Sequence, residues 1–192
     1  MTLDPKIQAI CFDAFGTLVE IQDKRRSHAA LIGHLDPKSQ ENLRHDIMRK
    51  PLTIQDCVNT YAQQLDKEII QMLEADLAAE LASITLRPQI DRLWSKLRAG
   101  GYKIALCSNL ALSYGPPLLE RLPDKPDALI LSYEASFIKP EPSIYQKVCE
   151  ALSLSPDAIL FTGDTKAADI DGPKAYGMEA EIIDSFTQRF LN

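Results

Sequence analysis

The spacing of apolar residues changes twice along the chain, and the two changes divide it into three stretches. Residues 7–12 (IQAICF) alternate at first and then become continuously apolar, as a buried parallel strand does. From about residue 21 to 86, apolar positions recur at helical spacing among abundant Gln, Glu, Lys and Ala, with little that resembles a strand. That block predicts three or four helices.

The third stretch predicts a regular alternation of helices and strands. The expected helices cover residues 89–98, 142–152 and 167–176, and the expected strands cover residues 103–107, 127–131, 158–162 and 179–183. Strands separated by helices form a parallel sheet, because parallel neighbours need crossover connections. We therefore expect an α/β fold, a Rossmann-like doubly wound parallel sheet with helices on both of its faces.

Polar residues follow four of the expected strands or lie in the loops after them. They are Asp13, Ser108 with Asn109, Lys139, and Asp164 with Asp169. Each has an ordinary structural explanation, such as a turn former or a helix cap, when it is considered alone. The carboxyl ends of parallel strands nevertheless meet at one edge of a sheet, so all of them are expected to face one crevice.

Charge and hydropathy exclude two classes of partner. The chain of 192 residues carries a formal net charge of −6, and the basic run Lys24-Arg25-Arg26 is too short to outweigh it as a nucleic-acid footprint. No segment approaches the roughly 18 apolar residues that a membrane span requires, and the first residues do not follow a signal-peptide pattern. We expect neither nucleic acid nor membrane as a partner.

The cysteines and histidines do not form a recognisable metal-binding pattern. The cysteines Cys11, Cys57, Cys107 and Cys149 are widely spaced, and they are expected to be reduced core residues of a cytoplasmic protein. The histidines His28, His34 and His45 lack the close spacing of a zinc site, and they are expected to be solvated helix residues.

Four short segments, in this order, resemble the motifs of the haloacid dehalogenase superfamily, a large group of phosphatases, dehalogenases and relatives. The segments are FDAFGTL (12–18), LCSN (106–109), FIKPEPSIY (137–145) and TGDTKAADIDG (162–172). Their spacing agrees with the family along nearly the whole chain. The resemblance implies a hydrolase core formed by residues 1–20 and 85–192, with residues 21–84 inserted as a small α-helical cap.

The resemblance also assigns roles to the residues at the strand ends. Asp13 would be a covalent nucleophile, Lys139 a fixed cation and Ser108 a hydroxyl donor, with Asn109 beside it. The backbone amides of residues 15–17, including Gly16, would be further donors to the substrate, and Thr17 would hold that turn.

Three carboxylates around one lysine leave excess negative charge, which raises a pKa or recruits a cation. Mg²⁺ prefers oxygen ligands and keeps several waters. The expected shell is therefore Asp13, Asp164, the backbone carbonyl of Phe15 and waters, with Asp169 as a direct or water-bridged ligand.

Phe15 leaves the reaction open, because the phosphatases of the family usually have a second, proton-donating aspartate at that position. Without that acid, a phosphatase would favour small phosphorylated metabolites with acidic leaving groups, such as acyl or aryl phosphates. The family's 2-haloacid dehalogenases instead have an aromatic residue there and a cap arginine, whose place Arg44 would take. A third alternative is a non-catalytic protein that binds phosphate. The acidic pair Asp164 and Asp169 favours the Mg²⁺-dependent phosphatase, and the oligomeric state is not predicted.

Overall fold

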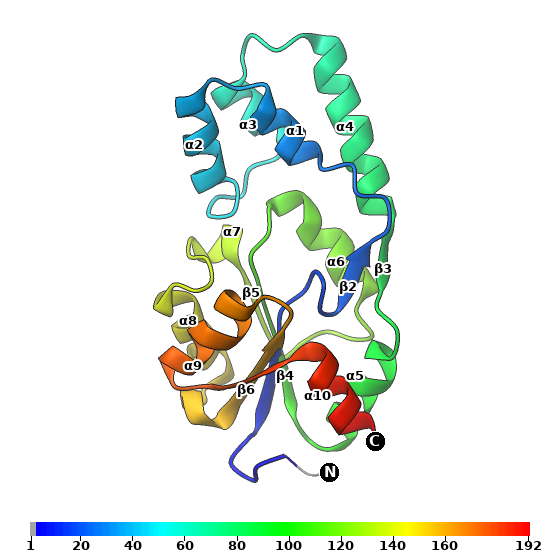
Figure 1. Ribbon diagram of the computed structural model, residues 1–192, viewed down its shortest axis with the longest axis vertical. Helices are drawn as coiled ribbons and strands as arrows, with labels where there is room; N and C mark the ends of the chain where they lie inside the picture. The colour runs from blue at the N-terminus through cyan, green and yellow to red at the C-terminus, as the bar shows by residue number, and fades with distance from the viewer. Residues whose placement is uncertain (1–2) are drawn as a thin grey trace.

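The computed structural model describes residues 3–192 and has a five-stranded parallel sheet at its centre (Figure 1). In spatial order the strands are β5 (Ala128–Leu131), β4 (Lys103–Ser108), β1 (Ala9–Phe12), β6 (Ile159–Gly163) and β7 (Glu179–Ile182). Every neighbouring pair is parallel. The expected α/β sheet is confirmed, and β1 lies between β4 and β6, so that the ends of these three strands are adjacent.

Helices cover both faces of this sheet because successive residues of β1 point to opposite sides. Ile10 and Phe12 belong to a buried cluster with Trp94, whereas Ala9 and Cys11 belong to a separate cluster on the other face. The covering helices are α5 (Ile90–Ala99), α6 (Gly115–Arg121), α7 (Ser132–Ala135), α8 (Pro142–Leu152), α9 (Gly172–Tyr176) and α10 (Ile183–Leu191). Short helical turns lie at Leu112–Tyr114, Pro156–Ala158 and Lys166–Asp171.

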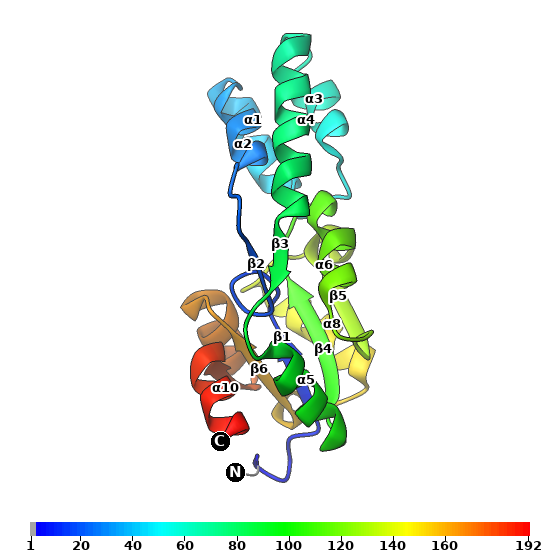
Figure 2. The same cartoon turned by 90° about the vertical axis from the view of Figure 1, so that its right-hand side faces the viewer.

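Four helices form a separate lobe beyond the carboxyl ends of the strands (Figures 1 and 2). They are α1 (Ser27–Gly33), α2 (Pro37–Asp46), α3 (Ile54–Tyr61) and α4 (Lys67–Ala82), and residues 27–82 are called the helical lobe below. The lobe has its own buried cluster, which includes Leu31, Leu43 and Leu73. The helix α3 begins with a capping box, in which the side chains of Thr53 and Asp56 each bond the other residue's backbone N–H.

Two short strands at the base of the lobe were not anticipated from the sequence. β2 (Val19–Ile21) and β3 (Ile84–Leu86) pair in antiparallel fashion where the chain enters and leaves the lobe. Each is only three residues long, so periodicity could not reveal them, and their pairing depends on two chain crossings lying side by side. Figure 2 shows this ribbon between the sheet and α4.

The expected helix over residues 167–176 is two elements rather than one. A π-helical turn at Lys166–Asp171 leads into the short helix α9. A Cβ atom on Gly172 would lie 2.2 Å from the hydroxyl of Tyr145, so the chain can pass this close only without a side chain.

The state of the cysteines and the length and polarity of the helices bear on two further expectations from the sequence. All four cysteines are free thiols, and Cys149 is half-buried while Cys11, Cys57 and Cys107 are buried. Within residues 3–192, every helix is too short or too polar to cross a membrane.

Candidate active site

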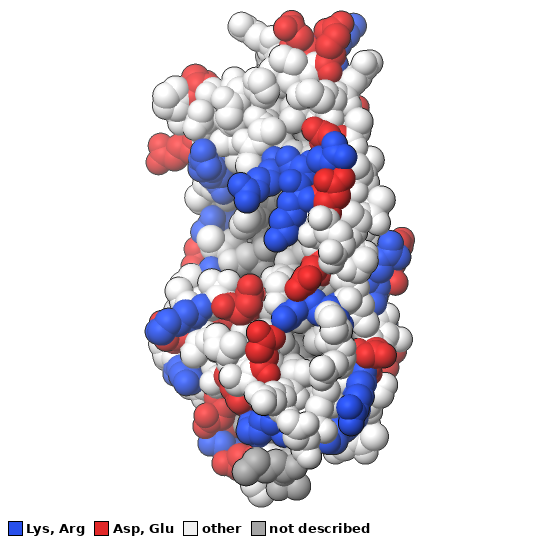
Figure 3. Space-filling model, turned by 45° about the vertical axis from the view of Figure 1, so that its right-hand side comes forward, with Lys and Arg blue, Asp and Glu red and all other residues white. Residues whose placement is uncertain are grey.

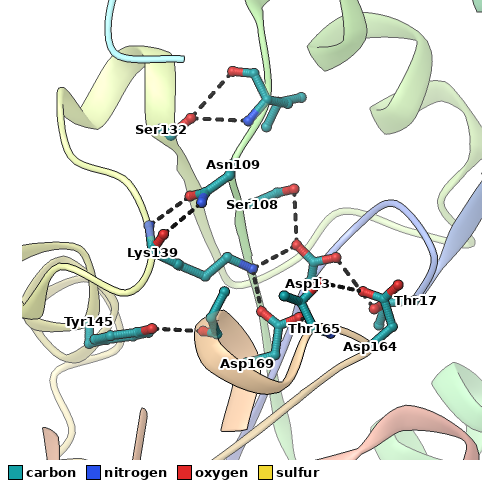
Figure 4. A network of polar contacts seen from close by, with 12 residues as sticks. Asp13, Thr17, Ser108, Asn109, Ser132, Lys139, Tyr145, Asp164, Thr165 and Asp169 are labelled. Atoms are coloured by element: carbon teal, nitrogen blue, oxygen red, sulfur yellow. Dashed lines mark hydrogen bonds and ion pairs between the residues drawn. The ribbon is translucent and has the colours of Figure 1, made fainter. Parts of the chain in front are cut away.

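Asp13 is the first residue after β1 and lies at the centre of a polar network (Figure 4). Its backbone N–H donates to the carbonyl of Thr162 on β6, which continues the pairing of the sheet beyond the strand. Its side chain is almost fully buried, and its Oδ1 atom accepts from Lys139 Nζ at 2.7 Å and from Ser108 Oγ at 3.2 Å. Thr17 Oγ1 lies 3.4 Å from Oδ2, so this second oxygen keeps lone pairs free for chemistry.

Lys139 joins two of the carboxylates. Its Nζ atom is 2.7 Å from Asp13 Oδ1 and 2.7 Å from Asp169 Oδ1, and the side chain is buried. Burial alone would lower the pKa of Lys139, but the surrounding negative charges, led by that of Asp13, outweigh it and hold the pKa well above its ordinary value. Lys139 is therefore a permanent ammonium group at neutral pH.

Asn109 fixes the backbone from which Lys139 projects. Asn109 Oδ1 accepts from the Lys139 backbone N–H at 2.7 Å, and Asn109 Nδ2 donates to the Lys139 carbonyl at 2.9 Å. These two bonds connect the loop after β4 to the loop after α7. Asn109 therefore lies beside Lys139 and holds its backbone in place.

Asp13, Asp164 and Asp169 bring carboxylate oxygens within 4.8 Å of one another. Burial raises the pKa of Asp169, and the positive charge of Lys139 opposes this effect. Asp164 is exposed and lies at the border of the site. When all three carboxylates are ionised, Lys139 balances only one of their charges. The donor set consists of oxygens with two uncompensated negative charges, which fits Mg²⁺.

Two glycines allow these carboxylates to approach. Gly16 has a φ of +84°, and a Cβ atom there would lie 2.3 Å from Asp164 Oδ2. A Cβ atom on Gly163 would lie 2.4 Å from the carboxylate carbon of Asp169. Larger residues at either position would push an acidic side chain out of the cluster.

The turn after Asp13 differs in one respect from the expectation. The N–H groups of Gly16 and Thr17 donate within the turn, to the carbonyls of Val19 and Ala14 at 2.9 and 3.3 Å. These two amides therefore stabilise the turn itself. The prediction was that they donate to a substrate, and in this structure their N–H groups are already used within the turn. Gly16 contributes to the site through the space that it leaves for Asp164.

Two residues that hold the site in place were not anticipated from the sequence. Arg87 donates to the carbonyls of Gly16 and Thr17 at 2.7 and 3.2 Å, and it also pairs with Asp184. The Thr165 backbone N–H donates to Asp169 Oδ2 at 2.9 Å. The Arg87 contact joins segments about 70 residues apart, so only the folded chain reveals it.

Phe15 borders a cavity of about 390 Å³ between the sheet and the helical lobe. Its ring packs edge-on against Tyr114, with ring centroids 5.6 Å apart. Arg26 and His28 line the cavity from the lobe side, whereas Arg44 is exposed on α2, where its guanidinium donates to Gln40. Figure 3 shows Lys and Arg side chains gathered beside the hollow between the helical lobe and the rest of the molecule.

His28 is not a solvated helix residue, contrary to the expectation from sequence. It is 9% exposed, and both ring nitrogens are buried without a hydrogen-bond partner in the described part of the chain. Burial lowers the pKa of His28 to about 4, so the ring is neutral at pH 7. The ring packs instead against Tyr114, with centroids 5.5 Å apart.

The buried His28 is expected to make stability fall in acid. As the pH falls, the His28 side chain of the unfolded chain binds a proton near pH 6.5, whereas that of the folded chain does so only near pH 4. The contribution of neutral His28 to stability is therefore complete above pH 6.5 and is lost as the pH falls from 6.5 toward 4. Between pH 7 and 4.5 the loss is about 2 kcal/mol of unfolding free energy. Urea unfolding of the wild type and of His28→Phe at both pH values measures it. Equal losses in the two proteins would contradict the assignment.

Comparisons with known proteins agree with this architecture. A family model described as "Hydrolase: haloacid dehalogenase-like hydrolase" matches residues 7–177. The chain is 28% identical over 197 residues to (S)-2-haloacid dehalogenase 1 of Pseudomonas sp. (strain CBS-3), covering 94% of this chain and 86% of that protein.

Solved structures of two kinds share the fold. An enzyme of the same family from Bacteroides thetaiotaomicron, in complex with magnesium and inorganic phosphate, aligns with a TM-score of 0.66 and 19% identity, covering 92% of this chain and 93% of that chain. L-2-haloacid dehalogenase from Xanthobacter autotrophicus, with chloropropionic acid covalently bound, aligns with a TM-score of 0.57 and 22% identity, covering 91% and 76%. The likeness to known structures therefore includes both metal-bound and dehalogenating relatives.

Proposed function

The chain belongs to the haloacid dehalogenase-like hydrolase family, and on that premise we propose that it is a Mg²⁺-dependent phosphatase of small phosphorylated metabolites. The observation that carries the proposal is the cluster of Asp13, Asp164 and Asp169 around the single ammonium group of Lys139. A divalent cation bound by these residues would neutralise the two remaining charges of the cluster. A phosphate dianion can then approach a nucleophile that would otherwise repel it.

In the proposed reaction, an oxygen of the Asp13 carboxylate attacks phosphorus. A bond forms between Asp13 and phosphorus, the bond from phosphorus to the leaving-group oxygen breaks, and the leaving group departs with the electron pair. Water then attacks the phosphorus, which releases inorganic phosphate and a proton and restores the Asp13 carboxylate. Lys139 and Ser108 hold Asp13 through Oδ1, which leaves Oδ2 as the attacking atom.

Asp13, Asp164 and the backbone carbonyl of Phe15 would hold Mg²⁺, with Asp169 as a direct or water-bridged ligand. The ion supplies charge stabilisation for the phosphoryl oxygens when it is bound. Asp169 also accepts the Thr165 N–H and contacts Lys139, which fixes its orientation within the cluster.

We assign the hydrolase core to residues 1–20 and 85–192 and a cap to residues 21–84. The β2–β3 ribbon supports this division, because both chain crossings between the two parts lie in it. The separate buried cluster of the helical lobe supports it as well.

Dehalogenation is the second candidate, and the curated relative from Pseudomonas sp. favours it. In that reaction Asp13 would attack the carbon that bears the halogen, halide would leave with the bonding electrons, and water would hydrolyse the resulting ester. Phe15 is compatible with this route because halide needs no proton. A metal beside Asp13 opposes it, since the ion would draw charge away from the attacking oxygen.

Two product assays on the full chain separate the candidates. Phosphate release from phenyl phosphate is expected with Mg²⁺ and is expected to disappear with EDTA. Halide release from (S)-2-chloropropionate is expected to stay at background in both conditions. Metal-independent halide release without phosphate release would identify the protein as a dehalogenase and contradict the phosphatase assignment. Tight phosphate binding without either product would identify it as a non-catalytic binding protein.

Substitution of Asp164 tests the cation site separately. Asp164→Asn keeps the side-chain shape but removes one of the two uncompensated charges, so Mg²⁺ affinity is expected to fall at least about 10-fold. Calorimetric titration with Mg²⁺ measures the change. Asp171→Asn is the matched control, because Asp171 lies nearby in sequence, is exposed and pairs with Lys166. Unchanged affinity in Asp164→Asn would place the cation elsewhere.

A further inference from the structure

Asp169 lies on a stretch of backbone that departs from α-helical hydrogen bonding. The turn that carries it is π-helical, and the Gly172 N–H donates to the carbonyl of Ala167. In an α-helix that N–H would donate to Ala168 instead, and the next residue along the chain, Pro173, has no N–H. The carbonyl of Ala168, directly before Asp169, is therefore left without either of these backbone donors.

The hydroxyl of Tyr145 supplies a donor to this carbonyl. It donates to Ala168 at 2.7 Å, and the Tyr145 side chain is fully buried (Figure 4). The absence of a side chain at Gly172 leaves the space in which the hydroxyl lies. Because an unpaired buried carbonyl costs free energy, this hydrogen bond stabilises the π-helical turn against other paths of the backbone.

The same hydrogen bond reinforces the ion pair between Lys139 and Asp169. Tyr145 lies on α8, the helix that follows the loop of Lys139, and its hydroxyl contacts the residue before Asp169. The two segments are therefore joined twice, by this hydroxyl and by the 2.7 Å contact of Lys139 Nζ with Asp169 Oδ1. The Tyr145 ring packs against Phe161 and Tyr176, with ring centroids 5.9 Å apart in both pairs. The hydroxyl is thus a fixed point that positions the π-helical turn.

We infer that Tyr145 is a positioning residue for the candidate cation site, and that its hydroxyl holds Asp169 where the site binds Mg²⁺ in preference to a larger cation. Mg²⁺ demands a nearly ideal octahedron of close oxygens, whereas Ca²⁺ tolerates longer and less regular coordination. An acid on a loosened turn therefore weakens the binding of Mg²⁺ more than that of Ca²⁺. The inference rests on the proposed function through its cation site.

The variant Tyr145→Phe removes the hydroxyl and keeps the ring, so packing changes little. Calorimetric titrations of the full chain with Mg²⁺ alone and with Ca²⁺ alone, in the absence of substrate, measure the two affinities. The Mg²⁺ affinity is expected to fall roughly 10- to 100-fold, as when a group that orients a metal ligand is removed. The Ca²⁺ affinity is expected to fall less than about 3-fold, because the larger ion accepts a displaced ligand.

Gly172→Ala breaks the same contact from the other side. Gly172 has a right-handed helical backbone, which alanine adopts without strain, but its Cβ atom would collide with the Tyr145 hydroxyl and move it away from Ala168. The same loss of preference for Mg²⁺ is expected. Tyr176→Phe is the matched control, because it removes a phenol hydroxyl from the ring beside Tyr145 and leaves the contact with Ala168 in place. Both of its affinities are expected to match the wild type.

Urea unfolding in EDTA separates positioning from a purely structural role, because it measures the stability of each variant without metal. A Tyr145→Phe protein that is less stable but binds both cations as the wild type does would overturn the inference, since the hydroxyl would then act on the fold alone. Equal losses of Mg²⁺ and Ca²⁺ affinity in Tyr145→Phe and Gly172→Ala would overturn it as well.

This inference and the proposed function fail in different ways. Mg²⁺-dependent phosphate release by the wild type, with an unchanged cation preference in both variants, overturns the inference alone. The expected shift in cation preference without phosphate release from phenyl phosphate overturns the phosphatase and leaves the role of Tyr145 in place. Absence of Mg²⁺ binding by the wild type overturns both.

Discussion

Replacement of Asp13 with asparagine is expected to lower turnover by roughly four orders of magnitude or more, because an amide cannot form the covalent intermediate. The substitution preserves the shape of the side chain, and Lys139 keeps its contact with Asp169 at 2.7 Å. The loss should therefore arise from chemistry and not from collapse of the network.

Phosphate release from phenyl phosphate with Mg²⁺ measures the effect of Asp13→Asn, and a urea unfolding curve establishes that the variant is folded. The exposed Asp171→Asn is again the control, with activity expected to match the wild type. A residual rate within 100-fold of the wild type would rule out covalent attack by Asp13.

Replacement of Phe15 with aspartate is expected to raise the rate on alkyl phosphates about 100- to 10,000-fold, the contribution of a positioned general acid. An alkoxide is a poor leaving group unless it is protonated as it departs, and the wild type has no acid at this position. The new carboxyl would lie close to Asp13 and the other acids, whose charges raise its pKa and favour the proton-donating form.

The comparison between two substrates isolates the effect of Phe15→Asp. The values of kcat/KM for ethyl phosphate and 4-nitrophenyl phosphate are measured with the variant and the wild type. The gain is expected for ethyl phosphate and is expected to be small for 4-nitrophenyl phosphate, whose leaving group departs as a stable anion. Phe15→Asn is the control, because it introduces a polar group without an acid. Equal gains with aspartate and asparagine would show that proton donation is not the missing function.

The positions of the main acidic groups and of Lys139 could be predicted because they depend on sheet topology. Once β1, β4 and β6 are parallel neighbours, Asp13, Ser108 and Asp164 must lie at one edge. The buried strands are marked by apolar runs, which explains why their limits agree with the sequence pattern to within about two residues. The pairing of Lys139 with Asp13 and Asp169 follows the same logic.

The remaining features depend on contacts between segments that are distant in sequence. Arg87 reaches the turn after Asp13 only because β2 and β3 pair at the base of the lobe. His28 carries a polar side chain at helical spacing, so its burial against Tyr114 has no local signal. The hydrogen bonds that the Gly16 and Thr17 amides make within the turn also depend on backbone geometry, which residue type alone does not determine.

In the proposed mechanism, Asp13 attacks phosphorus in the presence of a divalent cation, and no group donates a proton to the leaving oxygen. The dependence of kcat/KM on leaving-group pKa is the sharpest test of this mechanism, because kcat/KM includes the step in which that oxygen departs. For a series of substituted phenyl phosphates with saturating Mg²⁺, we expect log kcat/KM to fall steeply as the leaving-group pKa rises. A flat dependence, as protonated departure would give, would show that a group of the protein donates a proton to the leaving oxygen.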